Sequence, residues 1–426
     1  MEKKTRCRTY LKVVVRRSKD TVNDQEFLDS AKSRPQDFTR RRKMPFNKLV
    51  LFMLNMIKSS TQACLDRFFD LIGVEDVHMT QQSFSEARQK IRWEAFQHLF
   101  KVIIDEIYSG YTDTWHGYRV SAIDGSKLQI PDDKALRDYF GTAGKGHTAA
   151  TAQASALYDV FNNFLMDAQL EPMGIGEREL ALQHIEVLSK MESFDKELIL
   201  FDRGYASLEL LDALVLHGIS YVMRIRRKFN VSIDQLSEGD HHIVLRHKDG
   251  RDIEIRVIKF TLTSGEEETL ITDLTDKQMG MEDFKWLYGK RWPIETKYDE
   301  IKNKLEVENF SGRTYNAIMQ DFFVTMYMSN IAAIACWDAQ ERADKAREMK
   351  DNKYDYQINV NHAIGTLKDR FILAVLEPRR SLRNYKVDRI LYLIAETVVP
   401  SRPDRSFPRN PYPRKAKFRH NKKSNC

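Results

Sequence analysis

The order of strands and helices in the middle of the chain constrains its fold most. The apolar segment 118–123 predicts a strand, and the runs 152–160 and 164–170, joined by Asn162-Asn163, predict a hairpin. The elements that follow alternate between helix and strand, at 177–191, 198–201, 208–217 and 220–225. Three strands, a helix, a strand, a helix and a strand predict a mixed α/β domain, in which helices flank a mixed five-stranded sheet.

This layout matches the ribonuclease H type of sheet domain, and the flanking segments complete a domain plan. Residues 230–275 alternate apolar and polar side chains between turns, which predicts a β-rich insertion into the sheet domain. Helical spacing dominates before the first strand. The expected order is a basic N-terminal arm (1–47), a helical candidate DNA-binding region (48–115), the first part of the ribonuclease H-like catalytic domain (116–229), the insertion (230–275), the second catalytic part (276–345), a C-terminal helical region (346–400) and a basic flexible tail (401–426).

Charge is concentrated at the two ends of the chain. The net charge is +7, yet residues 1–45 carry +8 and residues 401–426 carry +8, which leaves −9 for the body. Basic ends around an acidic body are expected when tails hold a polyanion while carboxylates do chemistry. Tails that only keep the protein soluble remain an equal alternative at this point.

Cysteines and apolar runs exclude several classes of protein. The four cysteines contain no Cys-x-x-Cys pair, which argues against structural zinc and a disulfide framework and suits a reducing cytoplasm. The longest apolar run, at 49–57, is too short to span a bilayer, and the N-terminus lacks the apolar core of a signal peptide. We therefore expect a cytoplasmic, nucleoid-associated protein without a membrane partner.

Residues 80–91 form a candidate DNA-reading helix. Thr80 is a possible N-cap, and Arg88, Lys90 and Arg92 follow it. A polar loop that leads into a short basic helix is typical of the recognition helix of a helix-turn-helix. An ordinary surface helix in an all-α bundle explains the same pattern equally well.

Two aspartates lie where apolar strands are expected to stop. Asp124 follows the first strand, and Asp202 follows the strand at 198–201. Carboxylates at neighbouring strand ends can hold the divalent metal ions that cleave phosphodiesters. Aspartate after a strand is also common turn chemistry, so these two residues alone do not decide the function.

The segment 288–302 places cations beside a carboxylate. Tyr288, Arg291, Glu295 and Lys302 are separated by three, four and seven positions, and Pro293 suits the first turn of the helix that carries Glu295. On that helix Glu295 and Lys302 share one face. A solvated helix with a charged stripe is the alternative interpretation of this segment taken by itself.

This segment resembles the DDE transposases of bacterial insertion sequences. It matches, with every spacing intact, the Tyr-x₂-Arg-x₃-Glu-x₆-Lys signature that marks one branch of them. Residues 122–126 resemble the first Asp segment of the family, 201–205 its second, and 221–226 the Arg-bearing strand that follows. The resemblance covers about residues 48–380 and includes the β-rich insertion.

The resemblance implies a metal-dependent enzyme that cuts and joins DNA. Asp124, Asp202 and Glu295 would bind two Mg²⁺ ions, with Mn²⁺ as a substitute, to activate water and then the freed 3′-hydroxyl. Positioning and electrostatic stabilisation would supply the catalysis.

The other matched residues would contact DNA. Tyr288, Arg291 and Lys302 would hold phosphates beside the scissile bond and are associated in this branch with a hairpin intermediate, and Arg224 and Arg226 are weaker candidates for backbone contacts. The implied partners are double-stranded DNA, both terminal inverted repeats and target, and a second copy of the chain in a synaptic homodimer.

Aromatic residues and further carboxylates qualify the resemblance. Some members insert a Trp from the β-rich insertion into DNA, but residues 230–274 contain none, so either Phe229 or Phe260 substitutes for it or the chemistry differs. Trp286 and Trp292 are expected to pack their helix against the sheet. Asp159 and Asp299 are minor alternatives as metal ligands.

Two further functions remain open from the sequence. The first is a sequence-specific DNA-binding protein that derives from a transposase and has lost catalysis, although an intact acidic triad argues against it. The second is a metal-dependent nuclease without strand transfer, since the same triad performs both reactions.

Overall fold

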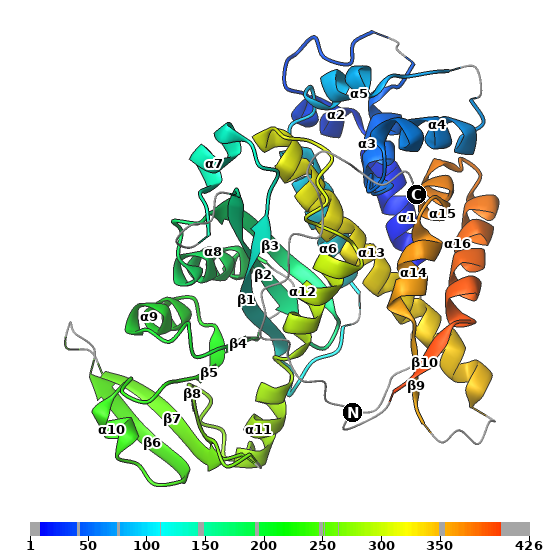
Figure 1. Cartoon of the computed structure of the whole chain (residues 1–426). Coiled ribbons are helices and arrows are strands. Elements are labelled where there is room, and N and C mark those ends of the chain that lie inside the picture. Colours follow the sequence, from blue (N-terminus) through cyan, green and yellow to red (C-terminus); the bar gives the residue numbers. More distant parts are fainter. Residues whose placement is uncertain are drawn as a thin grey trace. The chain divides into compact units, whose positions relative to one another are not determined.

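The computed structural model describes residues 9–40, 43–74, 77–110, 112–143, 149–191, 196–246, 250, 252–262, 264–348 and 354–401. The described residues form two compact units, labelled by element in Figure 1. The helical unit comprises residues 1–111, 128–151 and 300–426, and the sheet unit comprises residues 112–127 and 152–299. These units divide the chain differently from the expected domain plan, because the segment after the Glu295 helix joins the N-terminal helices.

One mixed sheet organises the sheet unit. Within the described residues it has eight strands in the order β3-β2-β1-β4-β5-β8-β7-β6. β1 runs parallel to β4, and β4 runs parallel to β5. The mixed α/β class is therefore confirmed. The strands are β1 (Arg119–Gln129), β2 (Thr151–Asp159), β3 (Phe164–Pro172), β4 (Glu197–Phe201), β5 (Ser220–Arg224), β6 (Gly239–Arg246), β7 (Asp252–Thr261) and β8 (Glu267–Thr272).

The β-rich insertion extends this sheet. The expectation of a five-stranded sheet was wrong in this respect, because β8 pairs antiparallel with β5, with Val222 opposite Thr272. β7 and β6 then add to β8 as antiparallel neighbours. Pairing with β8 satisfies the outer backbone groups of β5, which would otherwise form an exposed edge.

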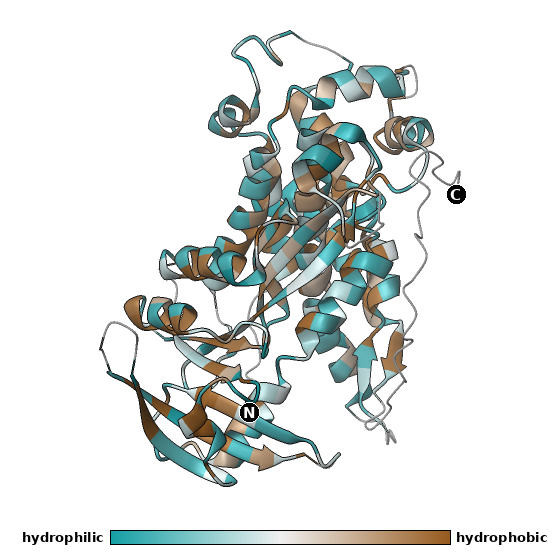
Figure 2. Ribbon diagram, turned by 60° about the vertical axis from the view of Figure 1, so that its left-hand side comes forward, coloured by the Kyte–Doolittle hydropathy of each residue, from teal (hydrophilic) through white to brown (hydrophobic). Residues whose placement is uncertain are grey.

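The central strands form because their side chains are buried. All five residues of β4 and all nine of β2 are buried, as expected for continuous apolar runs covered on both faces. Figure 2 shows hydrophobic residues gathered on strands and on the inner faces of helices. In the β2–β3 turn, Asn163 adopts φ 62°, and Asp159 accepts hydrogen bonds from the backbone N–H groups of Phe161 and Asn162. Asp159 is fully buried and holds this turn, so it is a structural residue.

Helices cover the sheet and carry part of the signature. α8 contacts β3, and α9 contacts both α8 and β5. Ser207 caps α9, as predicted, by accepting a hydrogen bond from the backbone N–H of Leu210 at 3.2 Å. The helices are α8 (Glu177–Ser189), α9 (Leu208–Leu216), α10 (Val231–Asp234), α11 (Met281–Gly289) and α12 (Pro293–Asn303), the last of which continues into the helical unit.

A long buried helix, α13 (Tyr315–Arg347), is the core of the helical unit. It is long and apolar enough to cross a membrane, but 78% of its apolar window is buried among the surrounding helices, so it is a core helix. This segment is longer than the run at 49–57 that the sequence analysis considered. Its neighbours include α1, α3, α6, α14 and α16. The remaining elements are α3 (Phe46–Leu54), α4 (Thr61–Leu71), α5 (Gln81–Arg88), α6 (Glu94–Tyr108), α7 (Lys134–Phe140), α14 (Val360–Leu367), α15 (Arg370–Leu376), α16 (Arg380–Ala395), β9 (Tyr356–Ile358) and β10 (Val398–Pro400).

Residues 10–31 do not form the expected basic arm. They fold into α1 (Tyr10–Val22) and α2 (Gln25–Ala31), and α1 packs on α13 and α6. The backbone N–H groups at the start of α1 donate to the carboxylate of Asp338, at 2.7 Å from Leu11. The arm interpretation failed because a charge count conceals the apolar face of this helix. The basic tail expected at 401–426 lies outside the described residues, except for Ser401.

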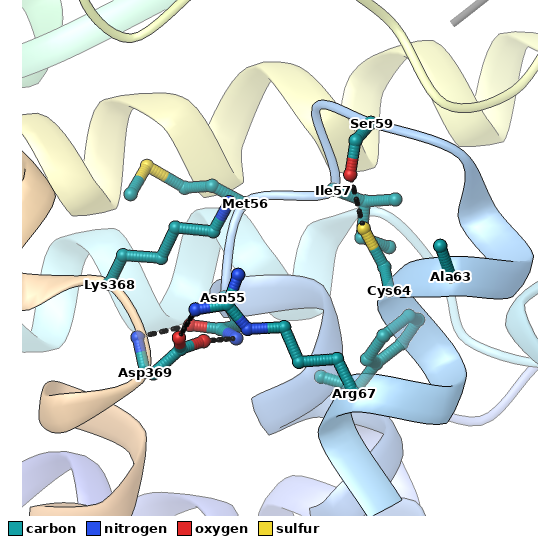
Figure 3. A pocket seen from close by; sticks show the side chains of 10 residues that line it. Asn55, Met56, Ile57, Ser59, Ala63, Cys64, Arg67, Lys368 and Asp369 are labelled. Carbon is teal, nitrogen blue, oxygen red and sulfur yellow. Dashed lines mark hydrogen bonds and ion pairs between the residues drawn. The ribbon is translucent and has the colours of Figure 1, made fainter. Parts of the chain in front are cut away.

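A polar latch joins the N-terminal and C-terminal helices of the helical unit (Figure 3). Asn55 and Asp369 exchange two hydrogen bonds, each 2.8 Å long, in which Asp369 contributes its side chain to one and its backbone N–H to the other. Arg67 adds an ion pair to Asp369. Asp369 has φ 66°, and Met56, next to Asn55, has φ 55°, so these contacts hold two strained backbone positions together. The residues line a cavity of about 140 Å³.

Candidate active site

Asp124 lies within β1, in the part of the strand that extends past the pairing with β4. The expected strand end at 123 was therefore too early. The Asp124 carboxylate accepts a hydrogen bond from the backbone N–H of Gly125 at 2.9 Å, and the Tyr298 hydroxyl donates to the Asp124 backbone oxygen at 2.9 Å. The pKa of Asp124 is raised to about 6, mainly by burial and also by Glu295 and Glu177, against the lowering effects of Gly125 and Arg291.

Asp202 follows β4 directly, as the sequence predicted. A backbone hydrogen bond of 3.1 Å from Tyr205 to Asp202 forms the turn after the strand. Its charge acts on Tyr205, Tyr288 and Arg291, and the pKa of each of these groups lies above its ordinary value. Asp202 therefore shares its surroundings with the signature residues on α11 and α12.

Glu295 lies in the first turn of α12, which begins at Pro293. Its carboxylate forms an ion pair of 3.0 Å with Arg291, one helical turn earlier. Burial alone would lower the pKa of Arg291, but Tyr288, Asp202, Glu295 and Asp124 together raise it above its ordinary value. Glu295 therefore pairs directly with the Arg291 guanidinium, and Asp124 and Asp202 act on it electrostatically.

The other DNA-contact candidates differ in availability. The Tyr288 hydroxyl is buried and has no hydrogen-bond partner among the described residues, and burial raises its pKa. Lys302 lies on α12 two turns after Glu295. Arg224 is held by Glu266 at 3.1 Å and Glu268 at 2.9 Å, whereas Arg226 is exposed. The structure therefore leaves Arg226 more accessible than Arg224.

Aromatic residues near the site depart from the sequence expectations. Phe260 is 6% exposed and lies under the Lys285 ammonium, so it is packed in the sheet unit and not presented to solvent. Trp286 and Trp292 are 45% and 54% exposed, so neither is a buried residue. Trp286 stacks at 6.0 Å on Phe161, in the β2–β3 turn of the sheet, which agrees with the expected packing for this residue. Burial could not be read here because a sequence pattern does not show which face of a short helix is covered.

A buried Ser–His–Asp arrangement lies next to β1, close to Asp124. The Ser155 hydroxyl lies 3.0 Å from His184 Nε2, and His184 Nδ1 lies 2.8 Å from the Asp167 carboxylate. Ser155 Oγ also lies 3.5 Å from the Asp124 backbone oxygen. All three side chains are at most 3% exposed, so the arrangement cannot reach a substrate and fixes the position of β2, β3 and α8.

The donor set fits a hard divalent cation in its chemistry. Asp124, Asp202 and Glu295 offer carboxylate oxygens, which Mg²⁺ and Mn²⁺ prefer. Burial and two neighbouring carboxylates raise the pKa of Asp124, which indicates a site with excess negative charge. Within the described part of the chain, no three His, Cys, Asp or Glu side chains are grouped closely enough to enclose an ion. Arg291 supplies the positive charge in this arrangement.

Comparison with known proteins assigns this site to a family. A family model described as a transposase DDE domain matches residues 115–331, which is half of the chain. The chain belongs to the DDE transposase family. The match includes Asp124, Asp202 and Glu295. As a DDE transposase, the protein is a DNA-cleaving and DNA-transposing enzyme of the insertion-sequence type, in a family that uses divalent metal ions.

Two relatives from Escherichia coli (strain K12) extend the match. The chain is 24% identical over 398 residues to the transposase InsG for insertion sequence element IS4, covering 87% of this chain and 86% of that protein. It is 24% identical over 208 residues to the putative transposase InsZ, covering 47% of this chain and 68% of that one. Among solved structures, a piggyBac transposase synaptic complex with hairpin DNA aligns with a TM-score of 0.46 and 12% identity, over 91% of this chain and 86% of the other.

The structure of this DDE transposase adds two residues that the sequence analysis did not select. Glu177 and Tyr205 both act electrostatically with Asp124, and neither belongs to the signature. Tyr205 follows Asp202 within the Asp-Arg-Gly-Tyr segment, which was a usable signal. Glu177 looks like an ordinary acid in the first turn of a helix, so only its three-dimensional position distinguishes it.

Proposed function

We propose that this transposase moves its element by cut-and-paste transposition, through a hairpin intermediate at each transposon end. Asp124, Asp202 and Glu295 are the catalytic residues and hold two Mg²⁺ ions, for which Mn²⁺ can substitute. The observation that carries the proposal is the 3.0 Å ion pair between Glu295 and Arg291, whose guanidinium also feels the charges of Asp124 and Asp202 in the same unit of the fold. The substrates are double-stranded DNA in the cytoplasm, namely the terminal inverted repeats of the element and the target DNA.

The carboxylates act by placing the reacting oxygens. Bound divalent metal supplies Lewis acidity at the scissile phosphate and lowers the pKa of the attacking hydroxyl or water. The Tyr298 hydroxyl fixes the backbone beside Asp124, and β4 fixes Asp202, so the carboxylates need little reorganisation before reaction. Catalysis by this chain is therefore positioning and charge stabilisation, without a covalent link between protein and DNA.

Arg291 exchanges partners when DNA binds. In the free protein its guanidinium balances Glu295 and neighbouring carboxylates. A phosphate of the DNA is a stronger bidentate partner for a guanidinium, so Arg291 turns to the backbone beside the scissile bond. The carboxylates are then left for metal. Tyr288, whose hydroxyl has no protein partner, and Lys302 contact the same strand.

Further DNA contacts come from the two weaker candidates and from the helical unit. Arg226 is exposed at the end of β5 and contacts the backbone directly, whereas Arg224 must first leave Glu266 and Glu268. Arg88 makes no DNA contact, because it is 1% exposed and bound to Gln320, Ser311 and Asp321. This removes one of the three cations expected on the candidate recognition helix.

A basic groove in the helical unit is the second DNA-binding surface. It has a volume of about 780 Å³ and lies beside the N-terminus of α5, where Thr80 caps the helix. Most of its charged side chains are basic, which complements phosphate, and a helix N-terminus favours the same anion. The groove residues that the proposal uses are Arg40, Lys43, His78, Thr80, Ser83 and Lys90. Two copies of the chain hold the two transposon ends in this way.

Strand-transfer assays with the full chain test the proposed function. The purified protein is incubated with Mg²⁺, a target plasmid and DNA ends that carry the terminal inverted repeats. We expect hairpin ends, seen as double-length single strands on a denaturing gel, followed by joined products. Cut ends without joining would support the nuclease alternative, and shifted but intact DNA would support the inactive DNA-binding alternative.

Matched variants test whether the proposed carboxylates are required for hairpin formation and strand transfer. Asp124→Asn should bind DNA but form neither hairpin nor joined product. Asp299→Asn, an exposed acid on α12 one turn after Glu295, should keep both reactions. Equal loss in both variants would contradict the assignment of Asp124.

A further inference from the structure

Glu177 occupies the space between the two aspartate segments of the sheet unit. A Cβ atom built on Gly125, next to Asp124, would lie 3.3 Å from Glu177 Oε1. A Cβ atom built on Gly204, two residues after Asp202, would lie 4.0 Å from Glu177 Oε2. The two oxygens of one carboxylate therefore face the two motifs.

The charge of Glu177 acts on the site. It contributes to the raised pKa of Asp124, and it also acts on the hydroxyls of Tyr205 and Tyr298. The side chain is exposed, and Gln153 Nε2 lies 3.5 Å from Oε1, at the limit of a hydrogen bond. A carboxylate that is accessible to solvent and repelled by its neighbours is well suited to bind a cation.

The Tyr205 hydroxyl is a second polar group that indicates a ligand site at the same place. Tyr205 is 2% exposed, and within the part of the chain that the structure describes its hydroxyl has no hydrogen-bond partner. Asp124, Glu177 and Asp202 all raise the pKa of this hydroxyl, so it lies within electrostatic range of the carboxylates. A buried hydroxyl without a partner is destabilising, and a hydrogen bond to water or ligand at this position would remove that penalty.

We infer that Glu177 is a fourth carboxylate of the cation site, shared with Asp124, and that the Tyr205 hydroxyl hydrogen-bonds to water held by that cation. The inference rests on the proposed metal-dependent function and adds residues outside the Asp–Asp–Glu triad. At Gly125 a Cβ would crowd the Glu177 carboxylate at 3.3 Å, whereas at Gly204 the same carboxylate leaves ordinary contact distance. At Gly125 any Cβ would also lie 2.9 Å from Gln153 Nε2, closer than contacts allow.

Helix capping alone does not explain Glu177. An acid in the first turn of α8 is favoured by the helix dipole, and Glu179 satisfies that preference equally well. Both side chains are exposed, but only Glu177 acts on Asp124, Tyr205 and Tyr298. Glu179 is therefore the matched control for the position of the carboxylate.

Binding of Mn²⁺ to the DNA-free protein tests the role of Glu177. Titrations followed by calorimetry and by electron paramagnetic resonance compare wild type, Glu177→Gln, Glu179→Gln and Asp124→Asn. Residues that ligate or orient a metal change its affinity by about 10–100-fold. We expect a loss of that size for Glu177→Gln and a change below about twofold for Glu179→Gln, with unchanged circular dichroism in both.

Tyr205→Phe tests the second half of the inference. Because the hydroxyl has no protein partner, the variant should unfold at the wild-type temperature or higher without metal. Its rise in melting temperature on addition of Mn²⁺ should be smaller than that of wild type. An undiminished rise would overturn the role of the hydroxyl.

The outcomes separate this inference from the proposed function. If Asp124→Asn loses Mn²⁺ binding but Glu177→Gln binds like wild type, Glu177 is not part of the site and the proposed function stands. If the wild-type protein binds no Mn²⁺, with or without terminal-repeat DNA, both the proposed function and the inference about Glu177 are refuted.

Discussion

Two arginine–carboxylate sites in this protein look alike in sequence and differ in their contacts. Arg88 in the helical unit donates to Gln320, Ser311, Asp321 and the backbone oxygen of Ala317, so every nitrogen has a partner. Arg291 in the sheet unit has one hydrogen bond among the described residues, to Glu295, although other carboxylates are near. A buried arginine whose nitrogens all have hydrogen-bond partners stabilises the fold. An arginine with few hydrogen bonds, beside hydroxyls without partners among the described residues, indicates a binding site.

Loss of the Glu295 carboxylate is the strongest way to test the functional half of this comparison. Glu295→Gln should keep terminal-repeat binding and reduce cleavage on the order of a thousandfold or more, because one metal ligand loses its charge. Gel shifts and Mg²⁺-dependent cleavage of the same DNA measure the two effects. Wild-type cleavage by this variant would refute the assignment of Glu295.

Exchanging arginine for methionine at the two sites separates structure from function directly. Arg88→Met removes the partner of Asp321 inside the helical unit and should destabilise the protein on the order of 3–5 kcal/mol. Arg291→Met should cost little stability but abolish cleavage, because its carboxylates can reach solvent or metal. Urea unfolding of both variants gives the free energies, and equal losses would mean that Arg291 is also a structural residue.

The pH dependence of stability sharpens the description of the candidate site. The pKa of Asp124 is about 6 in the folded, metal-free protein and near 3.8 when unfolded, because burial disfavours the charge. A carboxyl whose folded pKa is raised stabilises the fold at low pH, and this contribution is lost as the pH rises from about 4 to about 6.

Asp124→Asn should therefore stabilise the metal-free protein above pH 6, on the order of 2 kcal/mol, and the gain should vanish near pH 4. Thermal unfolding in the presence of a chelator measures it. With saturating Mn²⁺ at pH 8, wild type should regain the advantage. A variant that is less stable than wild type at pH 8 without metal would show that the ionised Asp124 is not under strain.

The order of the central elements was predictable because local patterns determine it. Asn162-Asn163 forms the expected turn, with Asn163 at positive φ, and Ser207 caps the expected helix. The joining of the insertion to β5 was not predictable, since strand pairing over long separations leaves no local signal. The charge count over residues 1–45 concealed α1, because a count of charges does not register the buried apolar residues of this helix, such as Leu11 and Val14.

The candidate site was predictable only in part, for a related reason. A fixed spacing identified Arg291 and Glu295, and strand ends suggested Asp124 and Asp202. Whether a Lys or Arg side chain can reach DNA depends on its burial, which the sequence does not show. Arg88 ends α5 and Lys90 follows two residues later, and nothing in their sequence distinguishes the buried arginine from the groove-lining lysine.

That pair gives the smallest and most specific prediction. Lys43→Gln combined with Lys90→Gln removes two cations from the basic groove of the helical unit. Removing one cation that neutralises a phosphate should reduce the slope of log affinity against log salt by about one, so the slope of the double variant should fall by about two. Affinity for terminal-repeat DNA should fall while melting temperature stays unchanged, since neither side chain is buried. Lys101→Gln, an exposed lysine on α6, should leave the slope unchanged. An unchanged slope in the double variant would mean that the groove does not hold phosphate. Lys90 would then be no more a DNA-binding residue than the buried Arg88.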